Sequence, residues 1–181
     1  MTEIEKDKED KKDIRDTIVA GIVFLIVLAI THFVFPLTIV DGRSMMNTLQ
    51  NGDIGITNTL EKTPKRGDIV IVKSKMDKEA HWIKRVIGLP GDTIYAKNGK
   101  VYINDKQLKE DYLDPEYGYT SDFEKRKLSN DEYFVMGDNR KESADSRMFG
   151  PFKKSDILST WKIRSSLMTE INHWVIGEPT K

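Results

Sequence analysis

The chain has 181 residues, enough for one membrane segment and one folded domain of ordinary size but not for two large domains. Lys plus Arg and Asp plus Glu both number 29, so the overall charge does not point to a nucleic acid or to an acidic substrate. The absence of cysteine excludes disulfides, thiolate metal sites and a cysteine nucleophile. The three histidines are scattered and form no HExxH pair, so we expect neither a metal nor another cofactor.

An apolar run over residues 18–35 is long enough to span a bilayer. As a helix, at about 1.5 Å per residue, it covers roughly 27 Å, close to the thickness of the hydrocarbon core. We therefore expect a tail over residues 1–16 and a transmembrane anchor over residues 17–36. A cleaved signal peptide is one alternative, but it would have a shorter apolar region and small residues at a cleavage site. A buried helix of a soluble protein is another, although the run is apolar on all faces.

The distribution of basic residues predicts the orientation of this segment. The tail carries five Lys or Arg residues, and the next basic residue in the chain is Arg43. Because orientation follows Lys and Arg, we expect a single-pass protein of the cell membrane with a cytoplasmic N-terminus. Residues 37–181 would then form an extracytoplasmic domain, and His32 would lie at the interface without a function.

Beyond residue 40 the sequence changes to short runs rich in Val, Ile and Tyr, separated by Gly-Asp and Asn-Gly turns. These runs predict strands over residues 68–74, 82–89, 92–105 and 132–138, with a hairpin turn in KNGK at 97–100. The fold class is therefore mainly β, an antiparallel β-sheet core behind a single N-terminal transmembrane helix.

Two parts of the domain lack a clear strand pattern. Residues 107–130 are polar and show no period, and we interpret them as a small insertion or loop on the β core. The C-terminal part contains Trp161 and Trp174 but no second spanning run. We expect both indoles to fill the core, with contact to the bilayer surface as the alternative.

Ser44 lies in VDGRSMMNTL, residues 40–49, just after the apolar run. Gly42 allows the backbone to turn sharply there. A serine in such a turn is more often structural than catalytic, because its hydroxyl is inert without a base. Histidine, the usual base, is badly placed, since only His81 lies in a strand-like part of the domain near other notable residues.

Lys84, three residues after His81, is the other candidate base. Side chains alternate along a strand, so Trp82 and Lys84 share one face. If that face is buried, desolvation favours the neutral lysine. With a reference pKa of about 10.4, only about one lysine in a few thousand is neutral at pH 7, so a base needs a depression of about two units or more. A lysine that faces solvent is the alternative.

A third cluster of polar residues lies at 134–152, in FVMGDNRKESADSRMFGPF. It includes Ser143, Asp145 and Arg147 in a loop-like span. The Asp145 and Arg147 pair would brace a turn, and such bracing also holds a catalytic lysine in place.

Taken together and in this order, these stretches resemble the type I signal peptidases, membrane-anchored serine proteases that remove signal peptides from exported proteins. DGRSMMNTL resembles the nucleophile box of that family, and RGDIVIV, residues 66–72, its second strand box. WIKRVIGLPGD is similar to the lysine box and GDNRKESADSR to the last box. The resemblance covers most of residues 17–165, and the short region before the last box is similar to the compact members from Gram-positive bacteria.

The resemblance implies Ser44 as the nucleophile and Lys84 as the general base. It also implies that Ser143 is hydrogen-bonded near the lysine and that Asp145 and Arg147 form a supporting ion pair.

Further residues follow from the same resemblance. Met45 would pack close to the reacting groups. Gly42 occupies the position from which a serine of certain Gram-negative members donates to the oxyanion, so the N–H of Ser44 is the expected donor and the second donor stays open. Asn47 replaces the usual proline and should loosen the turn. Trp82 replaces a commoner tyrosine.

The expected function is cleavage of signal peptides from exported preproteins, which would bind as an added strand beside the lipid bilayer. We expect no nucleic acid partner, and the oligomeric state stays open. One alternative is a membrane-tethered β module that binds exported chains without catalysis. Others are a Ser/Lys protease with one dedicated substrate and a triad based on His81.

Overall fold

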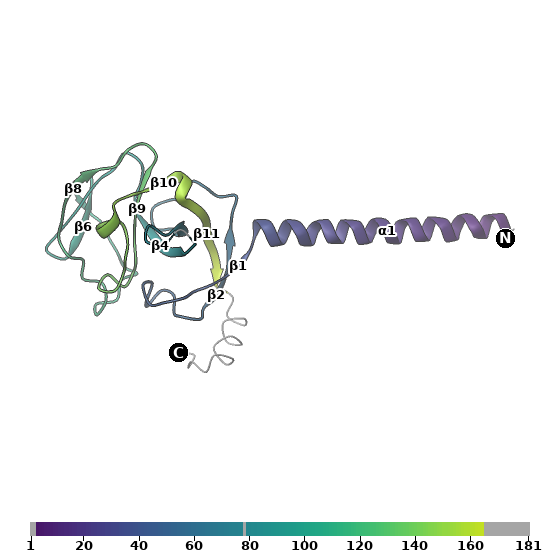
Figure 1. Ribbon diagram of the computed structural model, residues 1–181, viewed down its shortest axis with the longest axis horizontal. Coiled ribbons are helices and arrows are strands. Elements are labelled where there is room, and N and C mark those ends of the chain that lie inside the picture. Colours follow the sequence, from purple (N-terminus) through teal and green to yellow (C-terminus); the bar gives the residue numbers. More distant parts are fainter. Residues whose placement is uncertain (1–2, 78, 165–181) are drawn as a thin grey trace.

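The computed structural model describes residues 3–77 and 79–164. Helix α1 (Glu3–Val34) projects from a β-rich domain as a long rod (Figure 1). Its segment Lys11–Val34 is long and apolar enough to cross a membrane, by length and composition. None of the most apolar stretch of this segment is buried against the domain, which contradicts the alternative of a buried core helix.

The larger sheet has seven strands within the described residues, in the order β1-β2-β11-β3-β4-β9-β10, and all neighbours are antiparallel. Its strands are β1 (Leu37–Ile39), β2 (Ile54–Asn58), β3 (Ile69–Lys73), β4 (His81–Gly88), β9 (Glu132–Met136), β10 (Phe152–Lys153) and β11 (Ile157–Arg164).

A second sheet, in the order β7-β6-β5-β8, lies at the end of the domain away from α1 (Figure 1). Its strands are β5 (Thr93–Lys97), β6 (Lys100–Ile103), β7 (Lys106–Gln107) and β8 (Phe123–Lys127). The short helix α2 (Ser146–Phe149) and the 3-10 turn η1 (Lys154–Asp156) complete the domain. The predicted class, mainly antiparallel β with one N-terminal apolar helix, is confirmed.

The strands predicted from alternation are present as β3, β4, β5, β6 and β9. The predicted hairpin turn is also present, because Asn98 and Gly99 have φ values of 54° and 78°. Two consecutive positive φ values are what a two-residue turn between right-twisted strands requires.

Other strands were not predicted, for physical reasons. In β11 the buried positions include Ser159 and Thr160, so no apolar alternation is visible. The hydroxyl of Thr160 donates to Glu61 Oε2 at 2.9 Å, which is how a polar side chain can be buried there. The segment 107–130, expected to be an insertion or loop, contains β8, whose exposed charged residues hide its pairing with β5.

One apolar cluster is formed by the turn over residues 40–49, which we call the nucleophile turn after Ser44, the candidate nucleophile. Val40, Met45 and Leu49 form it, with Trp161 packed against them. The indole of Trp161 crosses over Gly55, where a Cβ would come within 2.0 Å of the ring, so only glycine fits. The expected core position of Trp161 is confirmed, whereas Trp174 lies outside the described residues.

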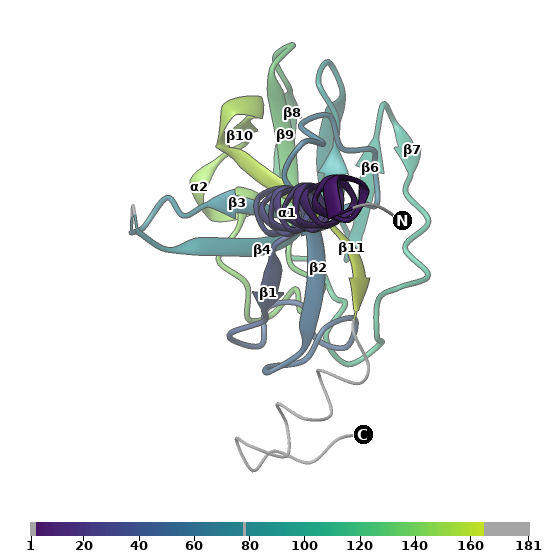
Figure 2. The same ribbon diagram turned by 90° about the vertical axis from the view of Figure 1, so that its right-hand side faces the viewer.

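The end of α1 is fastened to the larger sheet. The N–H of Thr57 donates to Pro36 O at 3.1 Å, and the N–H of Thr59 donates to Val34 O at 3.0 Å. Seen along the helix axis, α1 lies in front of the domain (Figure 2). These bonds fix where the apolar helix meets the domain.

Candidate active site

The nucleophile turn joins β1 to β2. Gly42 has a φ of 96°, a left-handed conformation that favours glycine, and its N–H donates to Asn51 Oδ1 at 2.9 Å. Met45 is buried against Val40 and Leu49, so the turn is held by an apolar side chain immediately after Ser44. Met45 thus lies next to the reacting groups, while the amide of Gly42 is already engaged.

Lys84, on β4, lies against the serine. Its Nζ is 2.8 Å from Ser44 Oγ and donates to Ile83 O at 3.0 Å. The lysine is 3 % exposed, and its Nζ is 5.8 Å from the centre of the Trp82 ring, on the same face of the strand. The alternative of a solvent-facing lysine is therefore wrong.

Burial sets the pKa of Lys84. Desolvation lowers the pKa to about 8, and this effect is larger than the opposing attraction of Asp145. With a pKa near 8, about one lysine in ten is neutral at pH 7, compared with about one in a few thousand for a free lysine. A group 2.8 Å from the serine hydroxyl can therefore accept its proton near neutral pH.

Asp145 and Arg147 form an ion pair behind the lysine. Asp145 is fully buried, and its Oδ2 accepts from Arg147 Nη2 at 2.8 Å and from the N–H of Gly137 at 3.0 Å. Burial raises the pKa of this carboxyl, but the contacts with Arg147 and Gly137 outweigh burial and lower it overall. The pair is thus a fixed charge that holds the start of α2 and the loop at Gly137 together.

Ser143 reaches the same place without the hydrogen bond that the resemblance implies. Its Oγ is buried and has no hydrogen-bond partner among the described residues. A Cβ built on Gly137 would lie 2.3 Å from this Oγ and 2.4 Å from the carbonyl oxygen of Ser44. Gly137 is therefore the residue that lets the two serines approach each other.

The sequence assigned no partner or role to several other residues of the site. Arg85 donates to both oxygens of Asp138 at 2.9 and 2.6 Å, and the Thr48 hydroxyl donates to the same carboxylate at 2.5 Å. Asn139, which is fully buried, contacts the nucleophile turn through two hydrogen bonds. The sequence signal was their position: Asp138 and Asn139 lie in GDNRKESADSR, Thr48 in DGRSMMNTL, and Arg85 directly after Lys84, without any pattern that assigns partners.

Asn47 and Trp82, which replace the proline and the tyrosine expected from the resemblance, also contact other residues. Asn47 Nδ2 donates to Asp114 Oδ2 at 2.6 Å, which links the nucleophile turn to the segment that precedes β8. Trp82 packs against Phe149 and Phe152, with ring centres 5.4 and 6.0 Å away.

Ser44 and Lys84 line a groove of about 410 Å³. Its sides come from residues 38–41 at β1 and residues 81–84 of β4, and β2, β3 and β11 contribute Thr57, Ile71 and Ser159. Among residues 3–77 and 79–164, the strand β1 pairs only with β2, and the half of β4 before Arg85 pairs only with β3. Both sides of the groove therefore carry backbone edges that can pair with an extended peptide.

His81 also lines this groove, but it is exposed and forms no hydrogen bond with Ser44 within the described part of the chain. The geometry gives Ser44 a lysine as its neighbour and does not assemble a triad on His81. A serine hydroxyl against a buried lysine, beside a peptide-sized groove, is the arrangement of a serine hydrolase with a lysine base.

Comparison with known proteins agrees with this class. The family model of signal peptidase, peptidase S26, matches residues 14–166. The chain is 40% identical over 182 residues to a signal peptidase I P from Bacillus subtilis subsp. natto, covering 93% of this chain and 98% of that protein. It is 41% identical over 157 residues to signal peptidase I S of Bacillus subtilis strain 168, covering 78% and 84%.

A crystal structure of a signal peptidase I from Enterococcus faecalis is also similar, with a TM-score of 0.49 and 33% identity over 55% of this chain and 97% of that one. From the family model and the curated relatives, the chain belongs to the signal peptidase family, peptidase S26.

Proposed function

We propose that this chain is a signal peptidase I in which Ser44 is the nucleophile and Lys84 the general base. The observation that carries the proposal is the 2.8 Å approach of a buried lysine Nζ to the hydroxyl of Ser44. The lowered pKa of Lys84, about 8, supplies the neutral amine that such a base requires.

The substrate would be a preprotein whose signal peptide enters the groove as an extended strand. Pairing with the free edges of β1 and β4 would fix its backbone. The apolar side chains of Ile39, Ile71 and Ile83 line the same groove, so small side chains at the first and third positions before the cut would bind against them.

The reaction would begin when neutral Lys84 takes the proton of the Ser44 hydroxyl, and Oγ attacks the peptide carbonyl. The N–H of Ser44, which has no hydrogen-bond partner within the described residues, would stabilise the oxyanion. Protonated Lys84 would then give its proton to the leaving amine. In the second half of the reaction it would take a proton from the water that attacks the acyl ester, and return that proton to Ser44 Oγ as the ester bond breaks.

Asp145, Arg147 and Ser143 would support the lysine in these steps. The Asp145 and Arg147 pair holds the loop at Gly137, and the free hydroxyl of Ser143 lies beside it. Rotation of this hydroxyl toward Nζ would supply the bond that orients the lysine.

The bilayer would be the second partner. Within the described residues, apolar side chains exposed near the end of α1 include Leu37, Ile39, Leu60 and Ile163. Leu37 and Ile163 both lie opposite Ile56, so they occupy one row across β1, β2 and β11. This apolar row, next to the end of the spanning helix, supports a domain that rests on the membrane surface.

The topology we propose has the N-terminal tail in the cytoplasm and the domain on the outer side of the cell membrane, as the basic residues of the tail predict. An anchor of this kind confines enzyme and substrate to one thin layer and raises their effective concentration. The groove includes Pro36 and Thr59, which lie at the end of the helix, so the bond that is cut would also lie just outside the membrane.

The test is cleavage of a purified preprotein in detergent micelles by the wild type and by Ser44→Ala, Lys84→Ala and His81→Ala. Circular dichroism confirms that each variant is folded. We expect cleavage after a small residue by the wild type and by His81→Ala, and none by the other two. An intact preprotein, under conditions in which a known signal peptidase cuts it, would contradict the proposal and favour a tethered binding module.

A further inference from the structure

Asn139 holds two consecutive carbonyl groups of the nucleophile turn. Its backbone N–H donates to Ser44 O at 3.0 Å, and its side-chain Nδ2 donates to Arg43 O at 3.2 Å. Asn139 is fully buried. Its Oδ1 accepts from the N–H of Glu142 at 3.2 Å, and because that N–H can only donate, the nitrogen of the amide must face Arg43.

Because the peptide unit is planar, the hydrogen bond to the carbonyl of Arg43 also constrains the N–H of Ser44. The carbonyl of Arg43 and the N–H of Ser44 belong to the same planar trans unit, so they point in opposite directions. A donor that fixes the oxygen of Arg43 therefore also fixes the direction of the Ser44 N–H. That N–H is the donor that would face the oxyanion, and an oxyanion donor works only where it is aimed at the developing charge.

We propose that Asn139 is a positioning residue that aims the N–H of Ser44 at the oxyanion. This inference rests on the proposed peptidase function and concerns the same site. Asn139 acts through the backbone of Arg43 and Ser44 and forms no hydrogen bond with Lys84 within the described ranges of the chain.

The nitrogen of the Asn139 amide contacts Arg43 and its oxygen contacts Glu142, so a matched pair of variants can separate the two contacts. Asn139→Asp keeps an oxygen for the N–H of Glu142 but replaces the donor to Arg43 with an oxygen that repels its carbonyl. Asn139→Ala removes both bonds and adds no repulsion. Both variants keep the backbone N–H that holds Ser44 O.

We expect kcat to fall about tenfold in Asn139→Asp, with KM within about twofold of the wild type, and to fall less in Asn139→Ala. Values of kcat are compared on the high-pH plateau, where Lys84 is neutral and a new charge near it has no effect. A role limited to filling space and holding Glu142 predicts the opposite order, with Asn139→Ala the more damaged. That order, or a wild-type kcat in Asn139→Asp, would overturn the inference.

A peptide aldehyde that ends at the residue before the cut gives a second readout. The Ser44 hydroxyl adds across its C=O bond, and the resulting hemiacetal oxygen occupies the oxyanion position. The ratio of its affinity to that of the matching peptide alcohol should fall by the same factor as kcat. An unchanged ratio beside a reduced kcat would contradict the role of Asn139 in aiming this N–H.

The inference and the proposed function fail in different ways. If the wild type does not cleave a preprotein, or if Ser44→Ala cleaves it, the peptidase function is wrong. If the wild type cleaves and Ser44→Ala does not, the variants of Asn139 decide the inference alone. Should Asn139→Asp not fold, a wild-type kcat in folded Asn139→Ala would be sufficient to reject it.

Discussion

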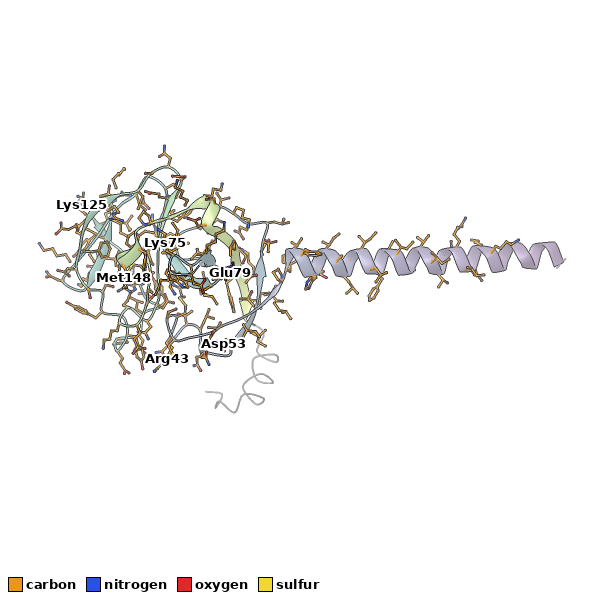
Figure 3. The ribbon with its side chains drawn as sticks, viewed as in Figure 1. Arg43, Asp53, Lys75, Glu79, Lys125 and Met148 are labelled. Carbon is orange, nitrogen blue, oxygen red and sulfur yellow. The ribbon has the colours of Figure 1, made fainter. Side chains whose placement is uncertain are left out.

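The core next to the four-stranded sheet and the region around Ser44 bury different kinds of side chain. Between the four-stranded sheet and strands β4 and β9 lies an apolar cluster that includes Ile94, Val101 and Phe134. Around Ser44, by contrast, the larger sheet and its loops bury ionisable groups, namely Lys84, Arg85, Asp138, Arg140 and Asp145. The second sheet, which carries Lys125 on β8, lies at the end of the domain away from α1, so the apolar cluster beside it is farther from the membrane helix (Figure 3).

This difference means that the apolar core mainly stabilises the fold, whereas the buried ionisable groups around Ser44 supply the reactive groups that we propose. Apolar burial stabilises the fold, whereas a buried charge costs stability unless it is paired. Arg85 and Asp145 are paired within the site, but Lys84 is surrounded by a hydroxyl, a carbonyl and an indole. Within the described residues no carboxylate contacts Lys84, and desolvation lowers its pKa, as expected of the base that we propose.

Among substitutions that keep both Ser44 and Lys84, the largest effect is expected from Gly137→Ala. The new Cβ would lie 2.3 Å from Ser143 Oγ and 2.4 Å from Ser44 O, so the nucleophile turn and the supporting loop must separate. We expect kcat/KM for a preprotein to fall by more than about a hundredfold, because a misplacement of about 1 Å can itself cost about a hundredfold. Full activity of a folded Gly137→Ala would show that this close approach is not needed.

Asp145→Asn should have the next largest effect. It weakens the hold on Arg147 and on the N–H of Gly137, and we expect kcat/KM to fall by about ten- to a hundredfold. The negative charge of Asp145 raises the pKa of Lys84, so its loss should move the acid limb of the pH–rate profile to lower pH. A shift of that limb to higher pH would contradict the electrostatic role of Asp145.

Lys84→Met should abolish cleavage and yet stabilise the domain at neutral pH. The folded pKa of Lys84, about 8, lies below its ordinary value of 10.5, so the cost of burying the charge is complete below pH 8. This cost disappears as the pH rises from 8 to above 10.5. We expect a gain of about 1–3 kcal/mol at pH 7 that shrinks toward pH 10, measured by urea unfolding. A loss of stability at pH 7 would mean that the lysine stabilises the fold.

The smallest effect is expected on the second sheet. Tyr95 and Tyr102 are cross-strand partners whose rings stack with centres 4.9 Å apart. Tyr102→Ala should lower the free energy of unfolding by about 1 kcal/mol and leave kcat/KM unchanged. A change in kcat/KM without a change in folded fraction would show that this sheet takes part in binding.

The same comparison explains how far the sequence alone could predict the molecule. Strands with an apolar face, such as β3 and β5, follow from alternation. The strand β11 was missed because Ser159 and Thr160 fill buried positions, and β8 because its charged side chains are exposed. Period-two patterns detect apolar burial and do not detect polar burial.

The site divides in a similar way. Ser44 and Lys84 could be proposed as nucleophile and base because their motifs, in this order, resemble those of a known family. The contact of Asn139 with Arg43 and the contact of Thr48 with Asp138 could not be predicted, because they depend on which loops meet in three dimensions. The hydroxyl of Ser143 lies beside Gly137, but whether it forms the hydrogen bond that the resemblance implies depends on a rotamer that no sequence pattern encodes.

The most direct measurement is the pH dependence of kcat/KM for a preprotein, recorded for the wild type and for His81→Ala. Our mechanism predicts that the rate rises with pH through an acid limb near pH 8, the pKa of Lys84, and that both proteins show the same limb. An acid limb at lower pH whose activity is lost in His81→Ala would assign the base to the histidine and contradict the role of Lys84.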